Sequence, residues 1–364
     1  MIKEIHAFFK REPRYFWLFL LVLAFYAFLY LGPRPAREGE THAPARKATS
    51  LREAEKKWNG RMDRESAFKE FASREPVLAA LFEIMTLLII LGLLAGGVFD
   101  VIFLTKPALR AQLTVGTDPP PVPQAWPFSM LFKVVILFVV WGILLSLGMG
   151  IVQALSPKWP TDNFFMIFHT LILNLICLYF MVRFLKQAGS HWRDLGFHLP
   201  AKGVLREIGL GIAGYMGVLP LFALVVAVLL VVAGIFHYEP PQHPLVSVFL
   251  EEEKRAPFLF VVSIFLGAVA GPVLEEVFFR GFCYPILRNK WGKVWAMALS
   301  AAFFAGIHYS GFVFWPIFVL GMALAVVYEK RRSLVACIAL HVTHNTFFIA
   351  YFFLVKHILG ENAF

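Results

Sequence analysis

Long hydrophobic runs separated by short polar segments make up most of the chain. Each run approaches or exceeds the roughly 20 apolar residues that a helix needs to cross a hydrocarbon core. They lie at 15–32, 77–105, 129–155, 164–185, 208–236, 258–287, 294–310, 312–329 and 334–355. The pattern predicts an all-α fold: a polytopic transmembrane helix bundle with about nine spans.

Two polar segments divide this series of spans. Residues 33–76 are Pro-rich at first and then charged, and the spacing around Trp58 favours an amphipathic surface helix. A second break, Asp118-Pro-Pro-Pro-Val-Pro123, follows the second span. We therefore expect an accessory region at 1–128, with two membrane spans and an extracytoplasmic segment at 33–76. A core at 129–364 should follow it.

Composition supports this interpretation. Hydrophobic residues account for 59% of the 364 residues and charged residues for only 16%. A soluble chain could not cover so much apolar surface, so the lipid bilayer is the expected surrounding. The net charge of +10 is attributed to loops on the cytoplasmic side, and no nucleic-acid partner is expected. Nothing in the sequence indicates an oligomeric state.

The distribution of lysine and arginine predicts the orientation of the spans. If the N-terminus is inside, the short inner segments hold sixteen of these residues and the short outer segments hold four. Basic residues accumulate in cytoplasmic loops. We therefore expect the N-terminus inside and the C-terminus outside, in what we take to be the cytoplasmic (inner) membrane of a bacterium.

Ionisable residues within the spans are costly and need a reason. Isolated ones, such as Glu83 and His169, are expected to be paired between helices. The segment from Gly271 to Arg280 differs because it contains Glu275, Glu276 and Arg280 together. Glu276 and Arg280 are four residues apart and can form an ion pair on one helix face. Glu275 points about 100° away and is free to act on another group, although a purely structural pair is the alternative.

Two further polar sets follow on later spans. Phe304 and His308 share one helix face, as do His341 and Asn345, and each set could serve only to pack helices. Together with Glu275 they supply a base, water-orienting groups and donors for an oxyanion. This combination suits attack of an activated water on an amide. Simple counting places His308 and His341 near opposite ends of their spans, so they can meet only if helices tilt or break around a wet cavity.

The ordered sets Glu275-Glu276-x-x-x-Arg280, Phe304-x-x-x-His308 and His341-x-x-x-Asn345 resemble the three motifs of the CPBP family. These are the CAAX prenyl protease and bacteriocin-processing intramembrane proteases, also called the Abi family. The stretch 192–197 also resembles the lead-in to that domain, and the likeness covers roughly 160–355. It implies an intramembrane endopeptidase core at 129–364, acting on a membrane-associated protein or peptide.

Residue by residue, the resemblance implies that Glu275 and His308 activate the water. His341 and Asn345 would stabilise the oxyanion, while Glu276 and Arg280 support the site. No metal cofactor is expected. The alternative is a zinc ion held by Glu275, His308 and His341.

Two other functions remain open from the residues alone. One is an ion- or proton-coupled transporter that uses the same polar residues as a relay. The other is a non-catalytic membrane immunity or scaffold protein on the same fold. The sequence does not identify the substrate: a prenylated C-terminus, a peptide leader and a C-terminal sorting tail all fit.

Overall fold

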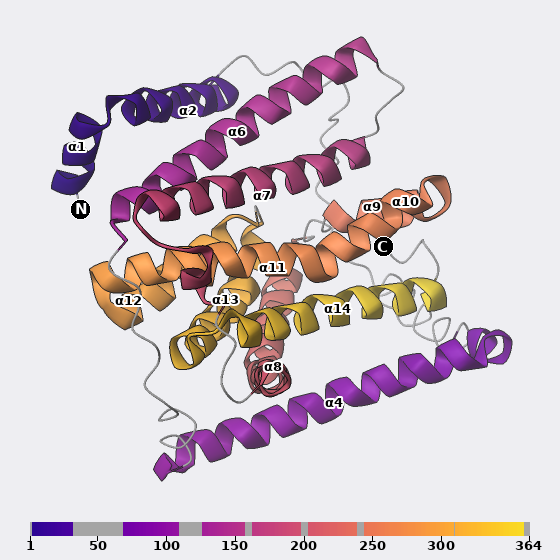
Figure 1. Cartoon of the computed structure of the whole chain (residues 1–364). Coiled ribbons are helices and arrows are strands. Elements are labelled where there is room, and N and C mark those ends of the chain that lie inside the picture. The colour runs from indigo at the N-terminus through magenta and orange to yellow at the C-terminus, as the bar shows by residue number, and fades with distance from the viewer. Residues whose placement is uncertain are drawn as a thin grey trace. The chain divides into compact units, whose positions relative to one another are not determined.

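The computed structural model describes residues 2–31, 68–108, 126–156, 162–197, 203–238, 244–308 and 310–359. Almost all of these residues are helical, and no strand occurs among them (Figure 1). The elements are α1 (Ile2–Arg11), α2 (Pro13–Leu31), α4 (Pro76–Thr105), α6 (Phe128–Leu155), α7 (Asp162–Gln187), η1 (Trp192–Leu195), α8 (Val204–Ile235), α9 (Pro244–Arg255), α10 (Pro257–Phe265), η2 (Leu266–Ala270), α11 (Gly271–Glu276), η3 (Val277–Cys283), α12 (Tyr284–Gly306), α13 (Gly311–Arg331) and α14 (Leu334–Leu359). The predicted all-α polytopic bundle is confirmed.

Seven helical stretches in the described part of the chain are long and apolar enough to cross a membrane, and Pro13–Ala27 is a shorter apolar helix. One stretch, Pro257–Gly306, is 50 residues long and holds two predicted spans. Gly292 separates them, with φ 76° and ψ 176°, a conformation that glycine adopts far more readily than other residues. The helices therefore fit roughly nine spans.

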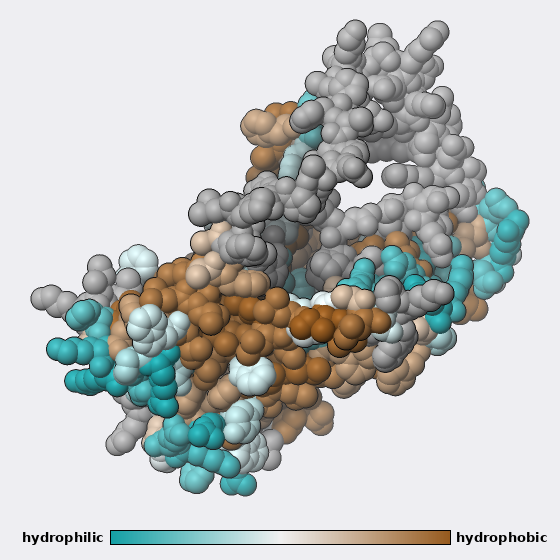
Figure 2. Space-filling model, turned by 90° about the horizontal axis from the view of Figure 1, so that it is seen from above, coloured by the Kyte–Doolittle hydropathy of each residue, from teal (hydrophilic) through white to brown (hydrophobic). Residues whose placement is uncertain are grey.

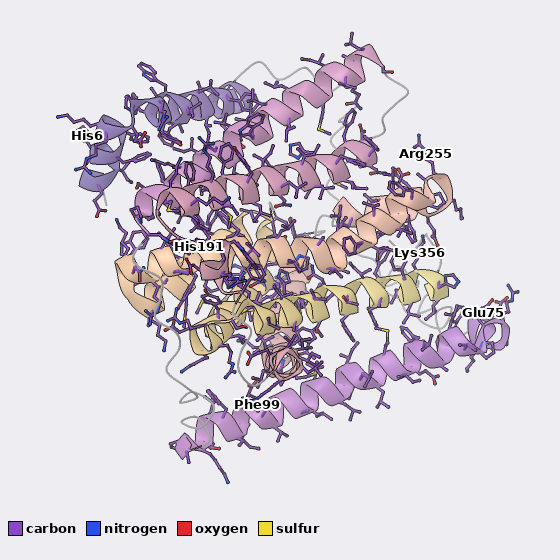
Figure 3. The ribbon with its side chains drawn as sticks, viewed as in Figure 1. His6, Glu75, Phe99, His191, Arg255 and Lys356 are labelled. Atoms are coloured by element: carbon purple, nitrogen blue, oxygen red, sulfur yellow. The ribbon has the colours of Figure 1, made fainter. Side chains whose placement is uncertain are left out.

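The predicted amphipathic helix around Trp58 and the Pro-rich break at 118–123 lie outside the described residues, so both stay predictions. By contrast, α9 is a helix that the hydrophobic pattern did not predict, because its 12 residues are too few to form a span. Figure 3 shows Arg255 at the end of α9, where the chain turns into α10.

The chain divides into two compact units. The first comprises Met1–Lys10 and Ile89–Ile349, and the second comprises Arg11–Leu88 and Ala350–Phe364. Within the second, the rings of Phe82 and Tyr351 stack with centroids 6.0 Å apart. All candidate site residues belong to the first unit. The predicted domain boundary at 128 stays a prediction.

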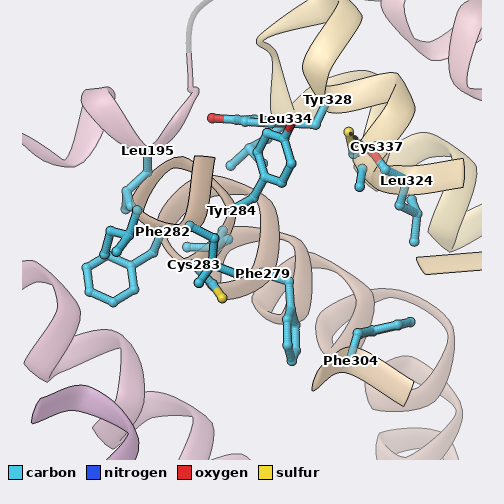
Figure 4. Packing of buried hydrophobic residues seen from close by; sticks show 14 of the residues in the cluster. Leu195, Phe279, Phe282, Cys283, Tyr284, Phe304, Leu324, Tyr328, Leu334 and Cys337 are labelled. Atoms are coloured by element: carbon cyan, nitrogen blue, oxygen red, sulfur yellow. Dashed lines mark hydrogen bonds between the residues drawn. The ribbon is translucent and has the colours of Figure 1, made fainter. Parts of the chain in front are cut away.

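A part of the core of the first unit forms where η3, α12, α13 and α14 meet (Figure 4). Phe279 packs edge-on against Phe304, with centroids 5.1 Å apart, and Tyr284 packs edge-on against Tyr328 at 5.7 Å. The η1 turn joins this core because the backbone N–H of Leu334 donates to the carbonyl of Gly196. The 192–197 stretch is thereby tied to the start of α14.

Large apolar side chains remain exposed on the outer helices, as expected for surfaces that face lipid. Leu155 of α6 and Leu205 of α8 are more than four-fifths exposed. Figure 2 shows a broad hydrophobic face with hydrophilic residues gathered at its margins. A water-soluble protein rarely presents so extensive an apolar surface, so this face is one that a bilayer would cover.

Candidate active site

The central glutamates lie on a helix of irregular pitch. The short α11 segment carries Glu275 and Glu276, and it is flanked by the π-helical turns η2 and η3. Such turns are rare and are frequently found at functional sites. Pro272 stands in the first turn of α11, where a proline is tolerated. The local backbone therefore departs from an ordinary helix on both sides of the glutamates.

Glu276 and Arg280 form the ion pair that their spacing predicts. Arg280 Nη1 donates to Glu276 Oε1 at 3.0 Å, and neither side chain is exposed. Arg280 Nη2 donates to the carbonyl of Gly321 in α13, also at 3.0 Å. The guanidinium carbon lies 4.7 Å from the centroid of the Phe304 ring, a cation–π contact. Arg280 therefore joins η3 to both α12 and α13.

His341 lies between the two glutamates. Its Nδ1 is 2.9 Å from Glu276 Oε1, and its Nε2 is 3.8 Å from Glu275 Oε2. A carboxylate paired with Arg280 can only accept, so the His341 Nδ1–H donates to it. This bond fixes the orientation of the ring and aims Nε2 at Glu275. The side chain of His341 is only 3% exposed.

Glu275 is the more accessible glutamate. Its side chain is 27% exposed, whereas that of Glu276 is fully buried. The carboxylate folds back over α11, with Oε1 3.9 Å from the place a Cβ would take at Gly271. At 3.8 Å its contact with His341 is longer than a hydrogen bond. Glu275 thus presents an open carboxylate beside a fixed imidazole.

His308 and His341 meet around one aromatic ring. The Phe304 centroid lies 5.2 Å from that of His308 and 5.6 Å from that of His341. His308 Nδ1–H donates to the carbonyl of Phe304 at 2.8 Å, and among the described residues this leaves Nε2 as its free acceptor. The two histidines that counting placed near opposite ends of their spans therefore contact a common side chain.

The α14 helix also contributes Asn345, whose amide Nδ2 donates to the carbonyl of Gly267 in η2 at 2.8 Å. A second N–H on the same nitrogen stays available to another acceptor. His344 faces a different group of side chains, because its ring packs among Tyr215, Phe222 and Phe348. Within the described residues its Nδ1 is buried without a hydrogen-bond partner.

The two backbone carbonyls that hold Arg280 and Asn345, those of Gly321 and Gly267, were not predicted. Every residue has a carbonyl, so the sequence pattern does not mark these two. For Gly267 one signal existed: Pro272 lies five residues later and has no N–H to offer. For Gly321 we find no such signal.

A metal centre would need several donor side chains that converge on one point. In the parts of the chain that the structure describes, no three His, Cys, Asp or Glu side chains converge as a possible metal site. The zinc set of Glu275, His308 and His341 is therefore not assembled in this arrangement. Metal dependence itself stays a prediction.

Comparison with known proteins supports the resemblance. Residues 257–347 match the family model described as type II CAAX prenyl endopeptidase Rce1-like. This confirms the predicted likeness to the CPBP family over 257–347, which is part of the expected 160–355 and contains every candidate residue. No curated protein and no solved structure matches the chain. The chain is an integral membrane protein, and its residues 257–347 are similar to this family model.

Proposed function

We propose that this protein is an intramembrane endopeptidase that hydrolyses a peptide bond in a membrane-associated protein or peptide. One observation carries the proposal: a partly exposed carboxylate, Glu275, lies 3.8 Å from an imidazole nitrogen whose ring is fixed by a second, buried carboxylate. A partly exposed base beside an imidazole of fixed orientation is an arrangement that suits general-base catalysis.

In the first step, Glu275 takes a proton from a water molecule as the water oxygen attacks the peptide carbonyl carbon. A water at about 2.8 Å from both Glu275 Oε2 and His341 Nε2 would lie to one side of the line joining them. His308 offers its free Nε2 to the second proton of the water.

The second step needs donors for the tetrahedral oxyanion. Asn345 retains one amide N–H after its bond to Gly267, and His341 supplies Nε2–H when its ring is doubly protonated. As the C–N bond breaks, the proton on Glu275 passes to the leaving nitrogen. The products are a carboxylic acid and an amine. Glu276 and Arg280 touch no reacting atom in this scheme and act by positioning His341.

Three probe substrates can identify the substrate class, each tested with the purified protein reconstituted in liposomes. They are a fluorogenic peptide with a farnesylated C-terminal CAAX sequence, a leader peptide and a membrane-anchored C-terminal tail. We expect cleavage of at least one, which is lost in Glu275→Gln and kept in Glu83→Gln, the same substitution on α4. If wild type and Glu275→Gln give the same signal on every probe, the proposal is wrong.

We also propose that the N-terminus and the inner loops face the cytoplasm and the C-terminus faces outward, in a bacterial inner membrane. The sixteen-to-four bias in lysine and arginine supports this orientation. All three native cysteines are buried, so an introduced cysteine should dominate the labelling. Lys293→Cys should react with an impermeant thiol reagent only from the cytoplasmic side, and Gly360→Cys only from outside. Labelling of both from one side contradicts the orientation.

A further inference from the structure

The carbonyl of Gly267 lies inside a helix, yet it accepts its hydrogen bond from a side chain. Asn345 Nδ2, on α14, donates to it at 2.8 Å. Backbone carbonyls within helices are normally taken by a backbone N–H four or five residues later. A reason is therefore needed for this one to be available.

The backbone register of η2 supplies that reason. The N–H of Gly271 donates to the carbonyl of Leu266, five residues earlier. Continued by one residue, the same register would pair the N–H of residue 272 with the carbonyl of Gly267. Residue 272 is a proline and has no N–H. The backbone therefore leaves the Gly267 carbonyl to Asn345.

The absence of a side chain at Gly267 lets α14 come close enough to use this carbonyl. A Cβ there would lie 3.1 Å from Leu245 Cδ1 and 3.2 Å from Ile349 Cδ1, tighter than ordinary contact. Ile349 is one helical turn beyond Asn345, so both project from the same face of α14. Gly267 and Pro272 thus both support the bond between Asn345 and the Gly267 carbonyl. Gly267 lets α14 approach, and Pro272 has no N–H to compete for the carbonyl.

The bond also sets the direction of the rest of the amide. An amide group is planar, so fixing one N–H on the Gly267 carbonyl fixes the plane that holds the other N–H. A donor held in place before reaction stabilises an oxyanion better than one that must first be oriented.

We propose that Pro272 is a positioning residue for Asn345: by withholding an N–H, it reserves the Gly267 carbonyl for the Asn345 amide. The inference rests on the proposed function. Pro272 touches no reacting atom. An alanine in its place would offer a competing N–H to the same carbonyl and release the amide to rotate.

The test compares Pro272→Ala with Pro316→Ala, which restores an N–H at a buried proline inside α13. The assay uses whichever of the three probe peptides the wild type cleaves. Pro272→Ala should lower kcat about tenfold or more, approaching the roughly 10²–10³-fold loss seen when an oxyanion donor is removed. KM should stay unchanged. In an Asn345→Ala background, Pro272→Ala should cause no further loss. Pro316→Ala should leave kcat unchanged.

A second variant covers the case in which Pro272→Ala does not fold. In Gly267→Ala the new Cβ should press on Leu245 and Ile349, disturb the nearby bond of Asn345 and lower kcat severalfold, with no further loss when combined with Asn345→Ala. Gly92→Ala is its control, since a Cβ there meets two side-chain ends at the same distances, 3.1 and 3.2 Å.

The outcomes separate this inference from the function on which it rests. If Glu275→Gln is inactive but Pro272→Ala is as active as Pro316→Ala, the inference is wrong and the proposed function stands. The inference also fails if the losses in Pro272→Ala and Asn345→Ala multiply in the double variant, because the proline would then act elsewhere. Wild-type cleavage by Glu275→Gln removes the proposed function itself.

Discussion

Two buried glutamates in the first unit, Glu276 and Glu329, each accept hydrogen bonds from several side chains, but only Glu276 has a carboxylate oxygen without a partner among the described residues. Both oxygens of Glu329 are engaged. Oε2 accepts from Tyr284, Arg288 and Arg332 at 2.7–2.8 Å, and Oε1 accepts from Arg288 Nη2 at 2.9 Å. Burial lowers the pKa of Arg332, and the Glu329 carboxylate opposes that effect. We call this group closed, because neither oxygen of Glu329 is left without a partner.

The group around Glu276 is open. Glu276 Oε1 accepts from both Arg280 and His341, while Oε2 is buried without a partner among the described residues. Beyond His341 the contacts continue to Glu275, which is partly exposed. A closed group of charges serves to hold helices together, whereas an open one leaves acceptors and donors for a ligand. The comparison separates a structural network from a candidate catalytic one.

Removal of a histidine from the open group should have the largest effect. We expect His308→Ala and His341→Ala each to reduce cleavage of the probe peptide by about 10²–10⁴-fold, the usual range for loss of an acid–base group. His169→Ala, on α7, is the matched control and should retain activity. Retained cleavage in both His308→Ala and His341→Ala would mean that the open group is not a catalytic site.

Glu276→Leu should show how strongly the buried pair supports the fold. It leaves Arg280 buried without its carboxylate, which costs about 3–5 kcal/mol when one partner of a buried pair is removed. The free energy of unfolding, measured by SDS titration in mixed micelles, should fall accordingly, and Glu275→Gln should barely change it. Equal losses of unfolding free energy in the two variants would show that Glu276 does not support the fold more than Glu275 does.

Glu329→Gln should have a smaller effect, and on stability alone. Arg288 is about one-third exposed and can be solvated, so we expect a loss of about 1–3 kcal/mol from the donors left without a charged acceptor. The kcat of the folded fraction should match wild type. A kcat reduced by 100-fold or more in stable Glu329→Gln protein would show that the closed group takes part in the reaction.

The smallest effect is expected from removal of metal. Cleavage should continue in a strong chelator, and purified protein should contain no stoichiometric zinc, because the glutamate mechanism needs none. Elemental analysis checks this directly. About one zinc per chain, lost together with activity in His308→Ala, would favour the alternative in which Glu275, His308 and His341 hold the metal.

The sequence alone predicted the helical bundle and the Glu276–Arg280 pair, because hydrophobic run length and i,i+4 spacing are local properties. It also placed His341 and Asn345 on one face of a helix. It could not predict that the Nδ1 of His341 faces Glu276, nor that Phe304 contacts both His308 and His341. Those contacts depend on how separate helices cross. The α9 helix was missed because the search was for runs long enough to span a membrane, and its 12 residues are too few.

The central claim is that Glu275 activates water for peptide hydrolysis. It is tested most directly by incubating purified wild type, Glu275→Gln and Glu329→Gln with the cleaved probe in water enriched in ¹⁸O. The products are then weighed by mass spectrometry. We predict one ¹⁸O in the new C-terminal carboxylate for wild type and Glu329→Gln, and no product for folded Glu275→Gln. Labelled product from Glu275→Gln at the wild-type rate would contradict the account.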